Sequence, residues 1–188
     1  GSLNKAIQPR DLVIPREVLD FSQTQYSAMP GRLRHQGLAN QLFCPAMAGT
    51  LEANARQAWP QPGRVLGHGH RVVATHNWGP RFTSRAEARA FQMLGGDVVN
   101  QSIGPEASAM REIGACFASS SYVVCWEDGV VDAPGEAIDP IHHDLARASV
   151  RISLLTMARV DPGEACGCAA LRIERAPEYA DFAPGIGF

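Results

Sequence analysis

Several features that would mark a specialised class of protein are absent from this sequence of 188 residues. Lysine occurs once, at position 5, against sixteen arginines, and no run of six residues carries charge of one sign. With a net charge of only -2, we expect neither a nucleic-acid partner nor binding to an anionic membrane. No stretch comes near the 18 consecutive apolar residues of a membrane span, and the first residues lack the apolar core of a signal peptide. These absences predict a cytoplasmic protein.

The five cysteines do not show the spacing of a disulfide framework, so we expect reduced thiols. One glycine separates Cys166 from Cys168. Zinc sites usually join a C-x₂₋₄-C to a second Cys or His pair, and no such pair stands nearby in the sequence. The pairs His68/His70 and His142/His143 likewise have no acidic or cysteine partners at ligand spacing. We therefore expect no metal and no cofactor.

Strand and helix signals alternate along a chain of ordinary globular composition, with 45% hydrophobic and 19% charged residues. Strands are expected over residues 8–19, 71–75, 97–100 and 115–126, the first with a buried run at Leu12, Val13 and Ile14. Helices are expected over residues 45–58, 84–94, 105–114 and 141–160. Residues 21–40 are predicted to form a long loop, and the tail after residue 160 has no assignable structure.

Particular residues define the ends and faces of these predicted helices. Pro45 is typical of a first helical position, and Ser84 with Glu87 forms a capping-box pattern. In the last helix we expect one apolar side, made of Leu145, Val150, Leu154, Leu155 and Met157.

The alternation predicts an α/β fold, with a mixed or parallel central sheet flanked by helices. Ligands of such sheets bind beyond the carboxyl ends of the strands. Those ends lie at residues 78–82, 100–102 and 125–128, so three polar or aromatic clusters are expected to converge there.

Residues 79–118 resemble the methylthioadenosine phosphorylase branch of the purine nucleoside phosphorylase family. The resemblance rests on a Gly-Pro-Arg-Phe turn, a Ser-Arg-Ala-Glu helix start, and Gly-Asp-Val-Val-Asn-Gln-Ser followed closely by Pro-Glu. Leu42-Phe43-Cys44-Pro45 is similar to the family's Pro-Phe-Cys-Pro, and residues 8–15 are similar to its Gln-Pro-Gly-Asp strand. The resemblance implies a phosphorylase-like domain over residues 1–160, with residues 161–188 as an unassigned tail.

The resemblance implies phosphorolysis, in which phosphate attacks the anomeric carbon of a purine nucleoside and releases the base and pentose 1-phosphate. Phosphate is then a co-substrate, and stabilisation of the leaving purine needs a hydrogen-bonding group at the base. Carried over by position, the catalytic candidates are Cys125 and Glu127, with Asp128 as another possible acid. The substrate-binding candidates are Phe82, Val99, Asn100, Gln101 and Trp126, and the phosphate-binding candidate is Ser102.

Two positions depart from the family pattern. Cys125 stands where the family has Asn or Asp at the purine, and a thiol hydrogen-bonds only weakly. Gln101 replaces a Met beside the ribose and suggests an altered sugar or base. These departures leave two other hypotheses open: a non-catalytic or assembly subunit with a residual nucleoside pocket, and hydrolytic deglycosylation on the same scaffold.

The family's Gly-Gly-Thr-Gly phosphate loop and its Arg-His pair would lie upstream of Gly1. The resemblance therefore leads us to expect an N-terminally truncated domain, whose phosphate-binding part comes from a longer reading frame or another chain. The family assembles as trimers, so the expected partners are a purine nucleoside, phosphate, and either further copies of this chain or a chain that supplies the upstream part.

Overall fold

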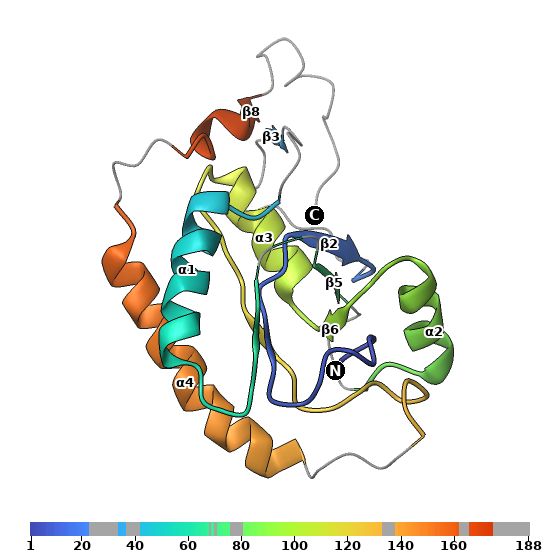
Figure 1. Cartoon of the computed structure of the whole chain (residues 1–188). Helices are drawn as coiled ribbons and strands as arrows, with labels where there is room; N and C mark the ends of the chain where they lie inside the picture. Colours follow the sequence, from blue (N-terminus) through green and yellow to red (C-terminus); the bar gives the residue numbers. More distant parts are fainter. Residues whose placement is uncertain are drawn as a thin grey trace.

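The computed structural model describes residues 1–22, 34–36, 42–67, 69, 71–75, 81–132, 138–161 and 166–174. It has the mixed α/β architecture predicted from the alternation of strands and helices (Figure 1). No helix among the described residues combines the length and apolar character needed to cross a membrane.

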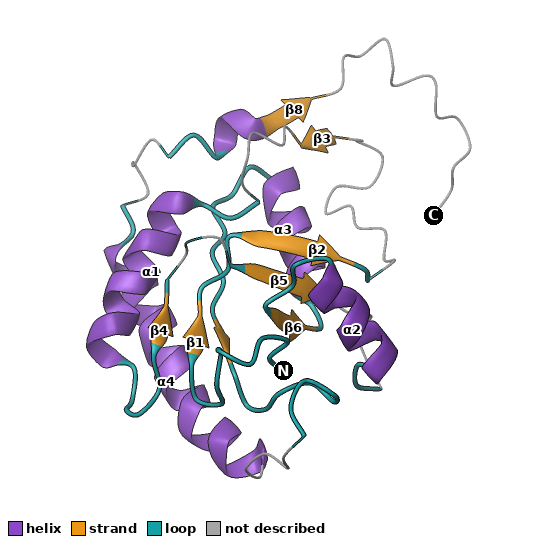
Figure 2. Ribbon diagram, turned by 45° about the vertical axis from the view of Figure 1, so that its right-hand side comes forward, coloured by secondary structure: helices purple, strands orange, loops and turns teal. Residues whose placement is uncertain are grey.

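Short strands from separate parts of the chain form the centre of the molecule (Figure 2). β1 (Leu12–Val13) pairs with β4 (Val65–Leu66) in parallel and with β7 (Ser121–Tyr122) in antiparallel orientation. β2 (Glu17–Asp20) pairs with β5 (Val72–Thr75), which pairs in turn with β6 (Val98–Asn100), all in parallel.

Residues 1–3 connect these two sheets into a closed ring. Ser2 forms one bridge to Val98 of β6 and a second to Trp126, four residues beyond β7. The chain continues from β1 into β2 and from β4 into β5. The order around the ring is therefore β7, then β1 with β2, then β4 with β5, then β6, and Ser2 links β6 back to the segment after β7.

Alternation along β1 explains how helices cover both sides of the strands. Leu12 and Ile14 are fully buried in a cluster with α1 (Pro45–Ala58) and α4 (Ile138–Arg159). Val13 points the other way, into a cluster with α3 (Ile103–Glu112). Successive side chains of a strand face opposite sides, so one short run serves both clusters. α2 (Arg85–Met93) packs through Ala88 and Phe91 on Leu3, on the far side of the molecule from α1 and α4 (Figure 1).

The predicted helix boundaries are confirmed where local signals set them. α1 begins at Pro45, preceded by Cys44 as N-cap residue, whose sulfur accepts from the Met47 N–H. In α2 both halves of the capping box between Ser84 and Glu87 are present. α3 begins at Ile103 rather than at Pro105, because a proline fits anywhere in the first turn, where N–H groups lack intrahelical acceptors.

Two predictions, one of a loop and one of a strand, need correction. Residues 21–40 are not loop throughout, since β3 (Arg34–Gln36) pairs with β8 (Arg172–Glu174). β8 lies in the tail, directly after a short 3-10 helix, η1 (Ala169–Leu171). The sequence around β3 does not indicate this partner, because the two strands are far apart in the chain. The strand predicted over residues 115–126 shrinks to Ser121–Tyr122, because only those residues pair with β1.

The predicted apolar side of α4 is also wrong in part. Leu145 is buried, but Val150, Leu154 and Met157 are 60%, 61% and 67% exposed. The face against α1 includes Thr156, whose hydroxyl oxygen accepts from Asn54 Nδ2 at 3.1 Å. A polar pair buried in the helix contact thus takes a place that the apolar pattern assigned to leucine and methionine.

Candidate active site

Residues 1–3 lie between β6 and the segment that follows β7. On one side, the Leu3 N–H donates to the Asp97 carbonyl at 2.9 Å, and the Val99 N–H donates to the Gly1 carbonyl at 2.8 Å. On the other, the Ser2 N–H donates to the Cys125 carbonyl and the Glu127 N–H to the Ser2 carbonyl, both at 2.8 Å. The fold therefore brings residues 97–99 and 125–127 to the same place, with residues 1–3 as the link.

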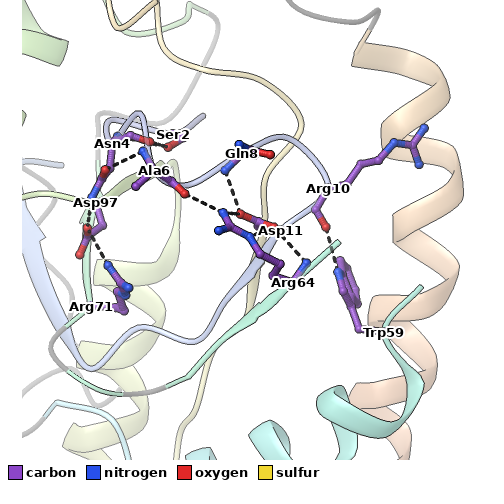
Figure 3. Close-up of polar contacts among 10 residues, drawn as sticks. All are labelled: Ser2, Asn4, Ala6, Gln8, Arg10, Asp11, Trp59, Arg64, Arg71 and Asp97. Carbon is purple, nitrogen blue, oxygen red and sulfur yellow. Dashed lines mark hydrogen bonds and ion pairs between the residues drawn. The ribbon is translucent and has the colours of Figure 1, made fainter. Parts of the chain in front are cut away.

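Two buried carboxylates fix the backbone on either side of this link (Figure 3). Asp97 accepts from Asn4 Nδ2 at 3.1 Å and from the Val72 N–H at 3.1 Å, and it lies 3.4 Å from Arg71. Asp97 thus ties the first residues to β5 as well as to β6.

Asp11 fixes the backbone where the chain leaves residues 1–3 and enters β1 (Figure 3). It is 2% exposed and accepts from the backbone N–H groups of Gln8, at 2.8 Å, and Arg64, at 3.0 Å, while the Arg64 guanidinium pairs with it. Burial acts to raise the pKa of Asp11, but the hydrogen bonds from Arg64 and Gln8 outweigh it and lower the pKa below its usual 3.8. Asp11 is therefore held ionised.

The Cys125–Asp128 segment presents side chains of three different kinds. Burial raises the pKa of the Cys125 thiol, and the nearby Glu127 charge adds to the rise, so the thiol stays protonated at neutral pH. The Trp126 indole Nε1 is buried, and no partner for it lies among the described residues. Glu127 Oε1 lies 3.4 Å from the Gly1 nitrogen, and its side chain is 12% exposed.

Asp128 points elsewhere. It is exposed and forms an ion pair with Arg85, at the start of α2, with 2.8 Å between Nε and Oδ2. The hydrogen bond from Arg85 lowers the pKa of Asp128 below its usual 3.8. A carboxyl group held ionised is a poor general acid at neutral pH.

The Asn100–Ser102 segment leads directly into α3. Asn100 Oδ1 accepts from the N–H groups of Ser102 and Ile103, at 2.8 and 2.9 Å, which leaves only its amide Nδ2 to donate to a ligand. Ser102 is the N-cap residue of α3, but its hydroxyl makes no capping bond within the described structure. Its exposed oxygen therefore stands at the positive end of a helix, a position that suits an anion.

Gly104, two residues into α3, was not predicted as a site residue. A Cβ built there would lie 2.6 Å from Asp20 Oδ2, so only glycine allows the carboxylate at the end of β2 to come so close. Asp20 places a negative charge near the same helix end as Ser102. No local signal in the sequence connects residue 20 with residue 104.

Phe82 is 85% exposed, three residues before α2 begins. Arg81 beside it pairs with Glu87 at 2.7 Å, which ties this segment to the helix start. An aromatic ring left in water is free to stack on a flat ligand. The rest of the predicted turn, residues 76–80, lies outside the described residues.

The candidate residues thus divide into two sets. Val99 and Glu127 are brought together around Gly1, and Trp126 is brought to Ser2. Gln101 and Ser102 are exposed just beyond β6, and Phe82 is exposed just before α2. The Arg85–Asp128 ion pair joins the start of α2 to residue 128. That ion pair was missed from the sequence, since its members stand 43 residues apart.

Comparison with known proteins decides the family. The Phosphorylase superfamily profile matches residues 1–160. This chain belongs to the phosphorylase superfamily. Among curated relatives, it is 31% identical to the "Probable 6-oxopurine nucleoside phosphorylase" of Korarchaeum cryptofilum, over 89% of this chain and 66% of the relative. It is 32% identical to S-methyl-5'-thioadenosine phosphorylase 2 of Puccinia graminis f. sp. tritici, over 75% of this chain and 44% of the relative.

A solved structure shows the same fold. Methylthioadenosine phosphorylase from Schistosoma mansoni, in complex with adenine, superimposes with a TM-score of 0.71 at 23% identity, over 91% of this chain and 68% of that one. This superfamily member therefore spans only about two thirds, or less, of the length of the curated relatives it matches.

Proposed function

We propose that this phosphorylase-superfamily protein takes part in the phosphorolysis of a purine nucleoside to free base and pentose 1-phosphate. The observation that carries the proposal is the superfamily match over residues 1–160, which includes every candidate site residue. Its relatives are named for 6-oxopurine nucleosides and for S-methyl-5'-thioadenosine, so the substrate class is a nucleoside of the methylthioadenosine, methylthioinosine or 6-oxopurine type.

The base is proposed to stack on Phe82 and to meet donors from residues 125–127. In support, Phe82 is 85% exposed and the Trp126 indole N–H is buried without a described partner. The Cys125 thiol, kept protonated by burial, can donate weakly to a purine that leaves with negative charge. Glu127 is the proposed general acid, because its side chain is only 12% exposed and its carboxylate lies 3.4 Å from the Gly1 nitrogen.

The sugar and phosphate are proposed to lie along β6 and the start of α3. Val99, Asn100 and Gln101 would line the pentose, and the free hydroxyl of Ser102 would contact phosphate at the helix end. The Asp20 carboxylate close to Gly104 opposes a second anion there, so phosphate binding needs additional cationic groups.

Incubation of the protein with inosine, adenosine and their 5'-methylthio analogues, with and without phosphate, tests the proposal. Phosphate-dependent release of free base is the expected result. Binding without turnover would favour the non-catalytic subunit, and release that does not depend on phosphate would favour hydrolysis. Ser102→Ala should raise the KM for phosphate and leave the KM for nucleoside unchanged, which separates the two halves of the site.

We also propose that the protein assembles as a homotrimer, as the family resemblance implies. The exposed Val150, Leu154 and Met157 support self-association, since they give α4 an apolar outer side. Light scattering coupled to size-exclusion chromatography should give three times the mass of one chain, and a monomer at micromolar concentration would contradict the proposal.

A further inference from the structure

Four of the five cysteines converge at one point of the fold, away from the strand-end site. Their sulfur atoms all lie within 4.8 Å of one another. We refer to them as the cysteine cluster, which consists of Cys44, Cys116, Cys166 and Cys168. The fifth, Cys125, lies beside Ser2 in the candidate active site.

Three separate stretches of chain build the cluster. The Cys44 N–H donates to the Phe117 carbonyl at 2.7 Å, which holds the start of α1 against the segment that follows α3. Gly167 has a φ of +77°, a conformation that other residues rarely adopt, so the chain can turn sharply between Cys166 and Cys168. η1 follows at once, and in both general views η1 and β8 lie beside the start of α1 and the end of α3 (Figures 1 and 2).

The cluster is far from the strand-end site. α3 has 10 residues and rises about 1.5 Å per residue, so its two ends are about 15 Å apart. Ser102 precedes its first residue, while Cys116 follows its last by four positions. The two regions therefore occupy opposite ends of the same helix.

The sulfur positions suit one tetrahedral metal ion. A zinc–sulfur bond of about 2.3 Å puts neighbouring sulfurs of a tetrahedron about 3.8 Å apart. The Cys116 and Cys166 sulfurs lie 3.2 Å apart and the most distant sulfurs lie within 4.8 Å, so the observed range brackets that value. A disulfide bond would bring two sulfurs to about 2.05 Å, and all five cysteines are free thiols in this structure.

Burial of the cluster is that of a closed, structural site. Cys44 and Cys168 are 1% and 2% exposed, and Cys116 and Cys166 are half-buried. Four protein ligands leave no open position for water or substrate, which distinguishes structural from catalytic zinc sites. A tetrahedral set of four thiolates is typical of zinc and of iron–sulfur centres, and four thiolates closed around one ion are a common structural zinc site.

We propose that the cysteine cluster binds one zinc ion as a tetrathiolate site. Binding replaces four S–H bonds with four Zn–S bonds and releases four protons to solvent, with no change of oxidation state. The ion cross-links η1 and β8 to the start of α1 and the end of α3, so that the tail becomes part of the domain. This role is independent of the proposed enzymatic function.

Titration of the reduced full chain with Co²⁺ under anaerobic conditions tests the site directly. We expect sulfur-to-cobalt charge-transfer absorption in the near ultraviolet and intense visible bands of a tetrahedral ion, saturating at one Co²⁺ per chain. Added Zn²⁺ should abolish both, since thiolates bind zinc more tightly than cobalt. Absence of these bands in folded, reduced protein would overturn the proposal.

Matched cysteine variants locate the ion. The double variant Cys166→Ser/Cys168→Ser should lose the cobalt spectrum and purify with little zinc, whereas Cys125→Ser should retain about one zinc per chain. Circular dichroism identifies any variant that fails to fold. The Co²⁺ titration of the wild type does not depend on these variants. Equal metal content in all three proteins would contradict the site, as would a reduced protein that forms two disulfides on reoxidation and takes up no metal.

Discussion

The backbone around residues 1–11 and the cysteine cluster beyond α3 are stabilised by different chemistry. In the first region, carboxylates with fixed hydrogen-bond partners hold the backbone: Asp97 joins residues 1–4 to β5, and Asp11 joins Gln8 to Arg64. At the Gly114 end of α3, four thiols face one another, and the neighbouring sulfurs of Cys116 and Cys166 offer each other only weak hydrogen bonds. The carboxylates of the first region have their partners within the chain, whereas the thiols of the second are proposed to bind an ion.

Removal of zinc should have the largest effect on stability. An ion present at about 1,000 times its Kd stabilises the folded state by about 4 kcal/mol. For a chain of this length, a chelator should therefore lower the Tm by roughly 10 °C. Differential scanning fluorimetry measures the change, and Cys125→Ser should respond as the wild type does. A Tm that the chelator does not change would mean that the cysteine cluster needs no ion for stability.

Loss of Asp11 should have the next largest effect, in the region around residues 1–11. Asp11→Ala leaves two buried N–H groups and the Arg64 guanidinium without their acceptor, so we expect a loss of about 3 kcal/mol in the free energy of unfolding. Urea denaturation provides the measurement. Asp144→Ala, which removes an exposed carboxylate 3.6 Å from Arg10, should change stability by less than about 0.5 kcal/mol.

The same carboxylate predicts a pH dependence. The folded pKa of Asp11 lies below 3.8, so its contribution is present above that pH and is lost as the pH falls through the folded pKa. Stability of the wild type should therefore decline below about pH 4, and Asp11→Asn should decline less steeply over that range. Parallel curves for the two proteins would show that Asp11 is not the group responsible.

Phe82→Ala should weaken nucleoside binding about tenfold, the effect of losing one aromatic stacking contact. Isothermal titration with a methylthio nucleoside measures it. Met93→Ala is the matched control, because Met93 is a large apolar residue, 83% exposed, at the far end of α2, the helix that follows Phe82. Unchanged nucleoside affinity in Phe82→Ala would contradict the proposal that the purine base stacks on Phe82.

The smallest expected effect concerns the ion pair that joins α2 to residue 128. Arg85→Gln should let the pKa of Asp128 rise toward its usual value, because the hydrogen bond that lowers it is gone. Carboxyl NMR titration detects the change. Arg81→Gln, whose partner is Glu87, should leave the pKa of Asp128 where it was.

Local signals in the sequence were sufficient for much of the fold. The capping box at Ser84 and the proline at position 45 fix helix starts through contacts within four residues, and both helices begin where predicted. The pairing of β3 with β8 and the buried face of α4 depend on partners more than 100 residues away, such as Asn54 for Thr156. Propensity and periodicity carry no information about such partners.

The candidate site shows the same division. Motif order along residues 79–129 was enough to name Phe82, Ser102 and Glu127 as candidates, and their roles stay predictions until tested. The insertion of residues 1–3 between Val99 and Glu127, and the approach of Asp20 to Gly104, arise only when the ring of strands closes. The convergence of the four cysteines was not predicted for the same reason, because Cys116 stands 50 residues before Cys166 in the sequence.

The ring of strands also sets an order of events during synthesis. Residues 1–3 are made long before either of their neighbours, Asp97–Val99 and Cys125–Glu127, has been translated. Until then they have no strand to pair with, and closing so long a loop is entropically slow. The pairing of residues 1–3 with both neighbours can therefore form only after residue 127 has left the ribosome, and a nascent chain stalled before that point would leave residues 1–3 available to chaperones and proteases.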